Sequence, residues 1–447
     1  MAHGFRTRTN PKCPTVLSEF PEDLPHGLLV NTESVSVENR TVIASERRAA
    51  IAFDAHRSVV SRLARLFRIP QRKSGGSTVV SFLKNLFSRS KNGIGLEICP
   101  DRVNLVKLKK QGSSYKLDLF ATEEVPEGIF AEGEIIDRPG MAELLGEFVT
   151  ANKIKTKHIA TAIPGRESIV RLIPVPAELE DENELRDYIN QEAGLYLPFP
   201  REEADVDYQR LGSFVDEDEV EKVQVLLVAT RKEVTDSYIA TFREAGLSID
   251  IIEVSSFSIL RIIREQLQQF TPSEASVLVD LEFDSTELVV IVDGVPQFSR
   301  TIPIGCFQIQ SALSEAMNLP PSRNIELLQG MTLPIDGVEA MTMGTMGGNN
   351  PGTTAMMKVL GELADEVRRS IDFYLNQSDG LEVAQIFLVG PGSSIGQLDE
   401  FFMQRLSIPT TQIDPVDSLG LEIAEELIPP VQRPGLGVIL GLGLREI

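Results

Sequence analysis

The chain has no tryptophan, only three cysteines and only four histidines among its 447 residues. The cysteines stand far apart, which argues against a disulfide framework and for a reducing cytosol. No two histidines have the spacing of zinc ligands. No apolar run reaches the roughly 18 residues that a membrane-spanning helix needs. These absences exclude a disulfide-stapled secreted fold and a histidine-based zinc centre.

Common catalytic motifs are also missing. The P-loop pattern G-x-x-x-x-G-K-[ST] does not occur, nor does H-E-x-x-H. Residues 392–396 match G-x-S-x-G between a predicted strand and a predicted helix, where a hydrolase carries its nucleophile. Such an enzyme needs a general-base histidine further along, but the last histidine is His158. We therefore interpret the match as a glycine turn.

Charge is divided unevenly along the chain. The net charge is −22, yet residues 1–92 carry 15 basic and 7 acidic residues, which leaves −30 for the remainder. An acidic body disfavours nucleic acid as a partner. A basic N-terminal region favours an anionic membrane surface.

Residues 1–78 differ from the rest in being rich in Arg, Ser, Thr and Pro, with little periodicity. They fit an organelle transit peptide, a disordered regulatory tail, or translated non-coding sequence before a true start near Val79 or Val80. We favour the last interpretation. Residues 79–92 form a basic amphipathic segment, which either meets lipid headgroups or docks on the protein's own body. Its membrane-proximal side chains would be Phe82, Leu83, Leu86 and Phe87.

A strand–turn–strand pattern occurs twice, over residues 95–108 and 278–291. The aligned pairs are Glu97 with Asp280, Asp101 with Asp284 and Leu105 with Leu288. Each copy turns again, adds a third strand and closes with Pro-x-Gly before helical sequence. The repeat predicts an α/β fold of two similar domains, with a cleft between the turns.

The remaining segments predict the domain organisation. Residues 93–166 would begin domain I, 167–246 would form a small inserted α+β subdomain, 247–275 would return to domain I, and 276–447 would form domain II. Within domain II we expect helices at 321–329 and 395–406, a mobile loop at 330–357 rich in Gly and Met, and a helix or strand at 434–444.

Several segments carry a family resemblance. They are Leu197–Pro200, Asp207–Gln209, Val228–Val234, Ile302–Gly305 and Ser370–Ser378. Together they resemble the PilM family of type IV pilus assembly proteins, in particular its cyanobacterial branch, and more distantly the cell-division protein FtsA. The resemblance covers about residues 93–447. It implies a duplicated actin-like (ribonuclease H-like) fold with an SHS2-like inserted subdomain.

The resemblance also implies partners and a location. A PilM-like protein would be a cytoplasmic scaffold, peripheral at the inner membrane, that forms an oligomeric ring. It would grip the cytoplasmic tail of PilN in a groove of the insert-bearing half. PilN and PilO would connect it to PilC and to the PilB and PilT motors, in support of pilus biogenesis and twitching motility. An active ATPase or kinase of the same fold, or an FtsA-like membrane tether, are the alternatives.

ATP with Mg²⁺ is the cofactor that an actin-like cleft implies. The candidate nucleotide-binding residues are Glu97, Cys99, Asp101, Arg102, Asp280, Asp284, Ser285, Thr286, Gly305, Gly390, Gly392 and Ser393. Asp280 is the candidate for catalysis and for positioning Mg²⁺, unless it only caps its turn. However, both turns lack the glycines that present backbone N–H groups to phosphates, and their carboxylates would repel a triphosphate. The residues therefore favour weak or no nucleotide binding and hydrolysis.

Overall fold

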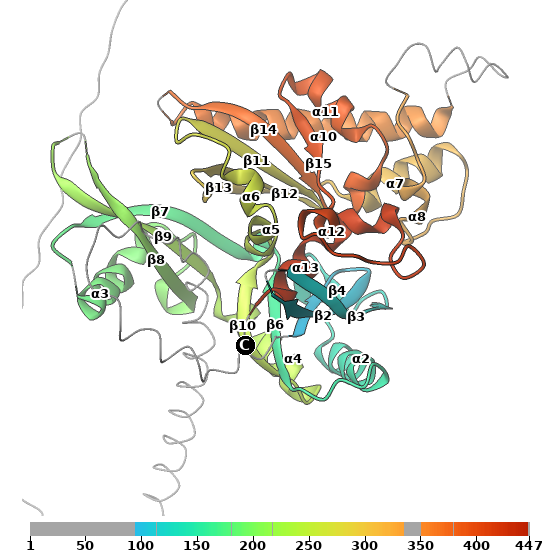
Figure 1. Ribbon diagram of the computed structural model, residues 1–447, viewed down its shortest axis with the longest axis horizontal. Helices are drawn as coiled ribbons and strands as arrows, with labels where there is room; N and C mark the ends of the chain where they lie inside the picture. The colour runs from blue at the N-terminus through green and yellow to red at the C-terminus, as the bar shows by residue number, and fades with distance from the viewer. Residues whose placement is uncertain are drawn as a thin grey trace, which may run out of the picture. The chain divides into compact units, whose positions relative to one another are not determined.

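The computed structural model describes residues 94–445, apart from 113, 180, 217, 335–349 and 379. The predicted segments 1–78 and 79–92, with Phe82, Leu83, Leu86 and Phe87, lie outside the described residues. The described part contains two five-stranded sheets, one three-stranded sheet, one two-stranded sheet and the helices that cover them (Figure 1).

The first sheet has the strand order β10-β6-β1-β2-β3. Its strands are β1 (Ile94–Ile98), β2 (Arg102–Gln111), β3 (Ser114–Glu124), β6 (His158–Ile163) and β10 (Ser248–Val254). β1 runs antiparallel to β2 and parallel to β6. Side chains alternate along a strand, so Leu96 points to the outer face of the sheet while Glu97 points to the inner face.

The second sheet repeats this arrangement with the order β13-β12-β11-β14-β15. Its strands are β11 (Glu274–Leu281), β12 (Thr286–Val292), β13 (Val295–Ile302), β14 (Glu382–Val389) and β15 (Thr410–Gln412). Glu97 pairs with Asn104 in the first sheet, and Asp280 pairs with Glu287 at the equivalent place in the second. The predicted duplication of an α/β domain is therefore confirmed.

Helices pack on both faces of each sheet (Figure 1). α2 (Arg138–Ala151) and α4 (Lys232–Glu244) cover the outer face of the first sheet. α7 (Cys306–Ala316), α10 (Pro351–Leu375) and α11 (Leu398–Leu406) cover the outer face of the second. α5 (Ser255–Ile262) and α13 (Gly437–Gly443) lie between the two sheets, in an apolar core that both inner faces share. This middle layer packs against both inner faces and so joins the two sheets.

Shorter elements connect these layers. They are β4 (Phe130–Ala131), β5 (Glu134–Ile135), α6 (Arg264–Leu267), α8 (Glu326–Gln329), α12 (Pro415–Ser418), and the 3₁₀ turns η2 (Gly165–Glu167), η3 (Ala193–Leu195), η4 (Arg201–Glu203), η5 (Pro391–Ser394) and η6 (Pro430–Leu436).

The inserted region forms a separate three-stranded sheet with the order β7-β9-β8. It comprises β7 (Ser168–Pro176), α3 (Glu182–Glu192), β8 (Ala204–Val215) and β9 (Glu221–Arg231). α3 packs on this sheet through Leu185 and Ile189. α4, which we placed in the inserted subdomain 167–246, instead buries Tyr238 and Phe242 in the core of the first sheet. The packing therefore favours an insertion that ends with β9.

Several expectations for the second half need correction. The helix expected at 321–329 is only α8, because residues 320–324 include prolines and irregular turns. The expected loop 330–357 is helical from Pro351, where Asn350 caps α10 and proline occupies the first turn. The helix expected from residue 395 starts at Leu398, because Gln397 has a left-handed backbone with φ of 61°. Residues 434–444 are helical, as η6 and α13.

Candidate functional site

Two tight turns face the cleft, one from each domain. In the first, the Cys99 N–H donates to the Arg102 carbonyl at 2.8 Å. In the second, the Glu282 N–H donates to the Ser285 carbonyl at 3.0 Å. These four residues occupy equivalent positions in the repeat, so the two turns have the same construction.

Buried carboxyl groups stand behind the turns. Glu97 and Asp280 are 5% and 1% exposed, because both point to the inner faces of their sheets. The Asn104 amide donates to Glu97 Oε2 at 3.0 Å. Asp280 interacts with the neighbouring Glu282 carboxyl group, while its Oδ1 has no hydrogen-bond partner within the described residues. Two neighbouring carboxyl groups repel each other when both are charged, so their proximity favours a proton on one of them.

The environment disfavours the charged form of these groups. Burial raises the pKa of Glu97, of Asp280 and of Glu287 above the ordinary values. Burial, with the nearby charge of Glu97, raises the pKa of Glu282 to about 8. The site therefore retains protons at neutral pH. It does not present the positive field that would attract a polyphosphate.

Side chains of the protein bridge the cleft directly. Arg166, which follows β6, pairs with Asp284 of the second turn at 3.4 Å. Arg323, which follows α7, donates from Nη2 to the Pro100 carbonyl of the first turn at 2.6 Å. Each bridge joins one domain to the turn of the other, so the two domains contact each other without an intervening ligand.

Glycines around the cleft allow this close contact. A Cβ built on Gly165 would lie 2.1 Å from Glu287 Oε1, and one on Gly390 would lie 2.6 Å from Asp280 Oδ1. The equivalent distances are 2.5 Å from Gly305 to the Ser285 nitrogen and 2.3 Å from Gly392 to Leu281 Cγ. Because the chain's own atoms fill the space beside these glycines, their bare backbone does not face a ligand.

The space left between the turns is a cavity of about 70 Å³. Predicted site residues that line it are Glu97, Cys99, Asp280, Asp284 and Ser285. Pockets that hold drug-sized ligands measure roughly 300–1,000 Å³, whereas a water needs roughly 10–15 Å³. The cavity has room for a few waters. ATP with Mg²⁺ does not fit between these turns, on grounds of both volume and charge.

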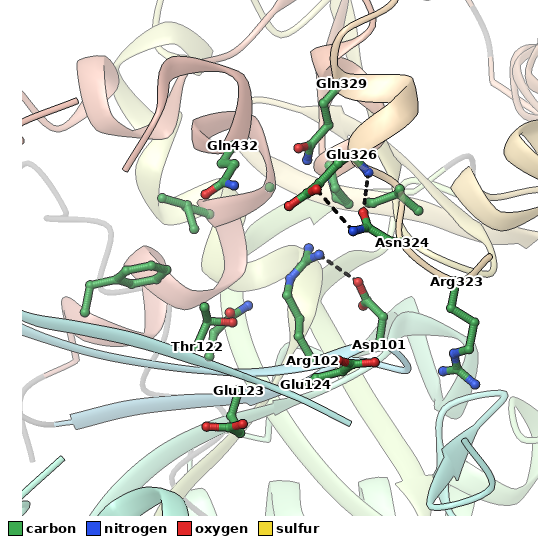
Figure 2. Close-up of a pocket in the computed structure, with 16 residues that line it drawn as sticks. Asp101, Arg102, Thr122, Glu123, Glu124, Arg323, Asn324, Glu326, Gln329 and Gln432 are labelled. Atoms are coloured by element: carbon green, nitrogen blue, oxygen red, sulfur yellow. Dashed lines mark hydrogen bonds and ion pairs between the residues drawn. The ribbon is translucent and has the colours of Figure 1, made fainter. Parts of the chain in front are cut away.

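A larger pocket of about 360 Å³ lies beside the first turn, bordered by β3, the loop before α8, η5 and η6 (Figure 2). Arg102 and Asp101, two predicted site residues, form an ion pair of 2.9 Å at its floor. Opposite them, the Asn324 amide donates to Glu326 at 3.1 Å. Its volume lies within the usual range for a small-molecule site, so the room for a ligand lies here and not between the turns.

Other predicted site residues have internal roles. The Thr286 hydroxyl donates to the Ile304 carbonyl at 2.6 Å, and the Ser393 hydroxyl donates to the Gly390 carbonyl at 2.8 Å. The sequence interpretation missed Glu287 and Arg166. Glu287 follows Asp280 at the same interval as Asn104 follows Glu97, so the repeat itself was a signal for it. No sequence pattern marks Arg166.

Neither a metal centre nor a membrane span is evident in the described part of the chain. Among residues 94–445 as described, no group of three or more His, Cys, Asp or Glu side chains is arranged to hold a metal ion. The helices that the structure describes include none with the length and apolarity to cross a membrane.

The protein has the actin-like ATPase fold. Its defining features here are two equivalent α/β domains, two helices between their sheets and a pair of turns at the cleft. Within that fold, the model of the family described as type IV pilus assembly protein PilM matches residues 95–336. The chain belongs to this family.

Solved structures with the same fold include a chain from the PilM–PilN type IV pilus biogenesis complex. It is 24% identical, with a TM-score of 0.65 over 80% of this chain and 99% of that chain. The ethanolamine utilization protein EutJ from Carboxydothermus hydrogenoformans is 13% identical, with a TM-score of 0.44 over 79% of this chain and 89% of that one. MreB5 of Spiroplasma citri bound to ADP is 12% identical, with a TM-score of 0.40 over 73% and 94%.

Proposed function

We propose that the protein is a scaffold of the type IV pilus assembly platform and binds the cytoplasmic tail of PilN. The observation that carries the proposal is membership of the PilM family over residues 95–336. The likeness to a chain of a PilM–PilN complex adds support. A scaffold requires a stable surface for partners and no catalytic step, which agrees with a cleft closed by the protein's own side chains.

We place the PilN site in the insert-bearing half. The inserted sheet has the order β7-β9-β8, so β8 is an edge strand. An edge strand offers unpaired backbone groups, to which an extended peptide can add. β8 is 12 residues long, which is ample for a short tail.

Peptide binding tests the proposal. A fluorescent peptide with the sequence of the PilN cytoplasmic tail is titrated with the full chain and followed by anisotropy, with a scrambled peptide as control. We expect saturable binding of the native sequence only. Hydrogen exchange should then show added protection in β8 and β9. Equal binding of both peptides would contradict the partner, and protection confined to the second sheet would contradict the placement.

Nucleotide has no role in this proposal. The pocket beside Arg102 has room for a small molecule, but the cavity between the turns has none for phosphates. We infer that the two domains are held closed by the Arg166–Asp284 and Arg323–Pro100 bridges. We therefore propose no hydrolysis and assign no catalytic role to Asp280.

The family further suggests the protein's surroundings in the cell. We propose that it works in the cytoplasm at the inner membrane, self-associates, and connects through PilN and PilO to PilC and to the PilB and PilT motors. Deletion of the gene should abolish pili and twitching motility. Filamentous cells with normal pili would instead indicate a role in division.

A further inference from the structure

Lysines are distributed very unevenly over the structure. Ten lysines lie between Ile94 and the end of the chain. Seven of them fall in just two segments: Lys107, Lys109, Lys110 and Lys116 in the β2–β3 hairpin, and Lys153, Lys155 and Lys157 in the loop between α2 and β6. The body that carries them has a net charge of −30. The concentration of seven lysines in two segments therefore contrasts with the charge around them.

Topology brings the two segments to the same end of the first sheet. Lys107 of β2 pairs with Ile94 of β1, and Ile94 pairs with Ile159, the second residue of β6. Neighbouring strands lie about 4.8 Å apart, so the hairpin and the lysine loop are separated by roughly 10 Å at this end. We call the seven lysines the lysine pole. It lies at the opposite end of β1 from the cleft.

The side chains of the pole are largely accessible. Lys109, Lys110, Lys116 and all three loop lysines are exposed, and the Lys107 side chain is 40% exposed. Acidic neighbours at this end include Asp118, which pairs with Lys107, and Asp250, which pairs with His158 at 3.0 Å. The seven lysines outnumber these two carboxylates, so the two segments carry a net positive charge.

One pair in the hairpin is unfavourable for folding. Lys109 lies directly across from Lys116 in the β2–β3 register. Like charges in directly opposed positions destabilise a sheet. The fold does not need this pair, since a carboxylate at either position would form a favourable cross-strand contact instead.

We propose that the lysine pole is a surface that binds an anionic phospholipid bilayer. Lysines spread over a hairpin and a loop match the diffuse charge of lipid headgroups, whereas recognition of single carboxylates favours the bidentate geometry of arginine. The acidic remainder of the body is repelled by such a bilayer, so the pole sets the orientation. The upstream residues 1–92, with a net charge of +8, join the sheet at this same end, at Ile94.

The proposal is independent of PilN binding, which the peptide titration measures without lipid. Its test is co-sedimentation of the full chain with vesicles of phosphatidylcholine alone or mixed with phosphatidylglycerol, at low and high salt. The pole variant is Lys109→Gln, Lys116→Gln and Lys155→Gln. The control variant is Lys222→Gln, Lys232→Gln and Lys358→Gln, the other three lysines between Ile94 and the end of the chain, and it changes the net charge equally.

We expect the wild type and the control variant to bind the anionic vesicles only, and high salt to release them. Each surface lysine contributes about fivefold to such binding, so the pole variant should bind roughly 100-fold more weakly. Lys116→Glu provides a check on folding, because it replaces the like-charge pair and should keep or raise thermal stability while weakening binding.

Three results would overturn the proposal. One is equal binding of the pole and control variants, which would assign vesicle binding to the upstream residues or another surface. The second is a wild-type protein that does not bind the anionic vesicles. The third is binding to polyglutamate, lost in the pole variant, without binding to vesicles, which would indicate an acidic protein as the partner.

Discussion

Glu282→Gln should change how stability depends on pH. Glu282 has a folded-state pKa of about 8, against 4.5 for the unfolded chain. The folded state therefore keeps a proton that the unfolded state releases. The stability from this proton is fully present below pH 4.5 and is lost as the pH rises through 8. The wild type should accordingly become less stable across this window.

The magnitude follows from linkage. One extra bound proton lowers the free energy of unfolding by about 1.4 kcal/mol per pH unit, or about 4 kcal/mol from pH 5 to pH 8. A glutamine cannot ionise, and its amide can donate to a neighbouring carboxylate. In the variant, the free energy of unfolding should therefore fall less steeply with pH, by about 1.4 kcal/mol per pH unit. A smaller slope should remain, because the pKa values of Glu97, Asp280 and Glu287 are also raised.

The assay is urea unfolding of the full chain at intervals between pH 5 and pH 9, followed by circular dichroism. Glu143→Gln, at an exposed position on α2, is the matched control and should keep the wild-type slope. The variant should also be more stable than the wild type at pH 8 and similar to it near pH 5. Identical slopes for Glu282→Gln and wild type would show that Glu282 holds no extra proton, and the reasoning would fail.

Three further outcomes follow from the same structure. Mg-ATP titrated by calorimetry up to millimolar concentration should give no binding heat, and micromolar binding would mean that the cleft opens. Gly390→Ala should lower the free energy of unfolding by about 2 kcal/mol more than the control Gly380→Ala. Both glycines have a positive φ, but only Gly390 lies against Asp280. Equal losses in the two variants would contradict the close contact. Arg445→Ala should lower the free energy of urea unfolding by about 2 kcal/mol, because Arg445 Nε donates to the fully buried Glu253 at 2.7 Å. Arg261 still pairs with Glu253 at 2.8 Å in the variant, so the charge is not left alone, and an unchanged stability would refute the role of Arg445.

The repeat could be predicted from sequence because it is local. Each copy is a pair of adjacent strands, and period-two alternation already assigns Glu97 and Asp280 to inner faces. Their position at the cleft follows from the duplication. Glu287 could have been found in the same way, from its equivalence to Asn104.

Long-range packing could not be predicted in this way. α4 follows the inserted sheet directly in sequence, yet Tyr238 and Phe242 pack in the first core, because an apolar face does not specify which core it joins. The start of α10 was missed for another reason. The Asn350–Pro351 start signal was present, but the surrounding Gly- and Met-rich composition suggested a loop.

One physical explanation accounts for the positions of the glycines at the cleft. The turns themselves lack glycine, whereas the segments around the turns contain it. A phosphate-binding turn needs bare backbone on the turn itself. In this protein the turns carry carboxylates, and the glycines lie opposite buried carboxyl groups. Gly390 lies against Asp280, and Gly165 lies against Glu287. The space that a nucleotide would need is therefore occupied by the chain, and restoring glycine to the turns alone would not create a phosphate site.

The closed cleft and the lysine pole lie at opposite ends of the first sheet. β1 starts at the lysine pole and ends, five residues or roughly 17 Å later, in the closed cleft. A bilayer at the pole would therefore leave the cleft at the end of β1 that lies farther from the lipid. On this view the domains need no nucleotide-driven motion, because a protein that orients by charge and holds its partner on a rigid surface can act as a scaffold in one conformation.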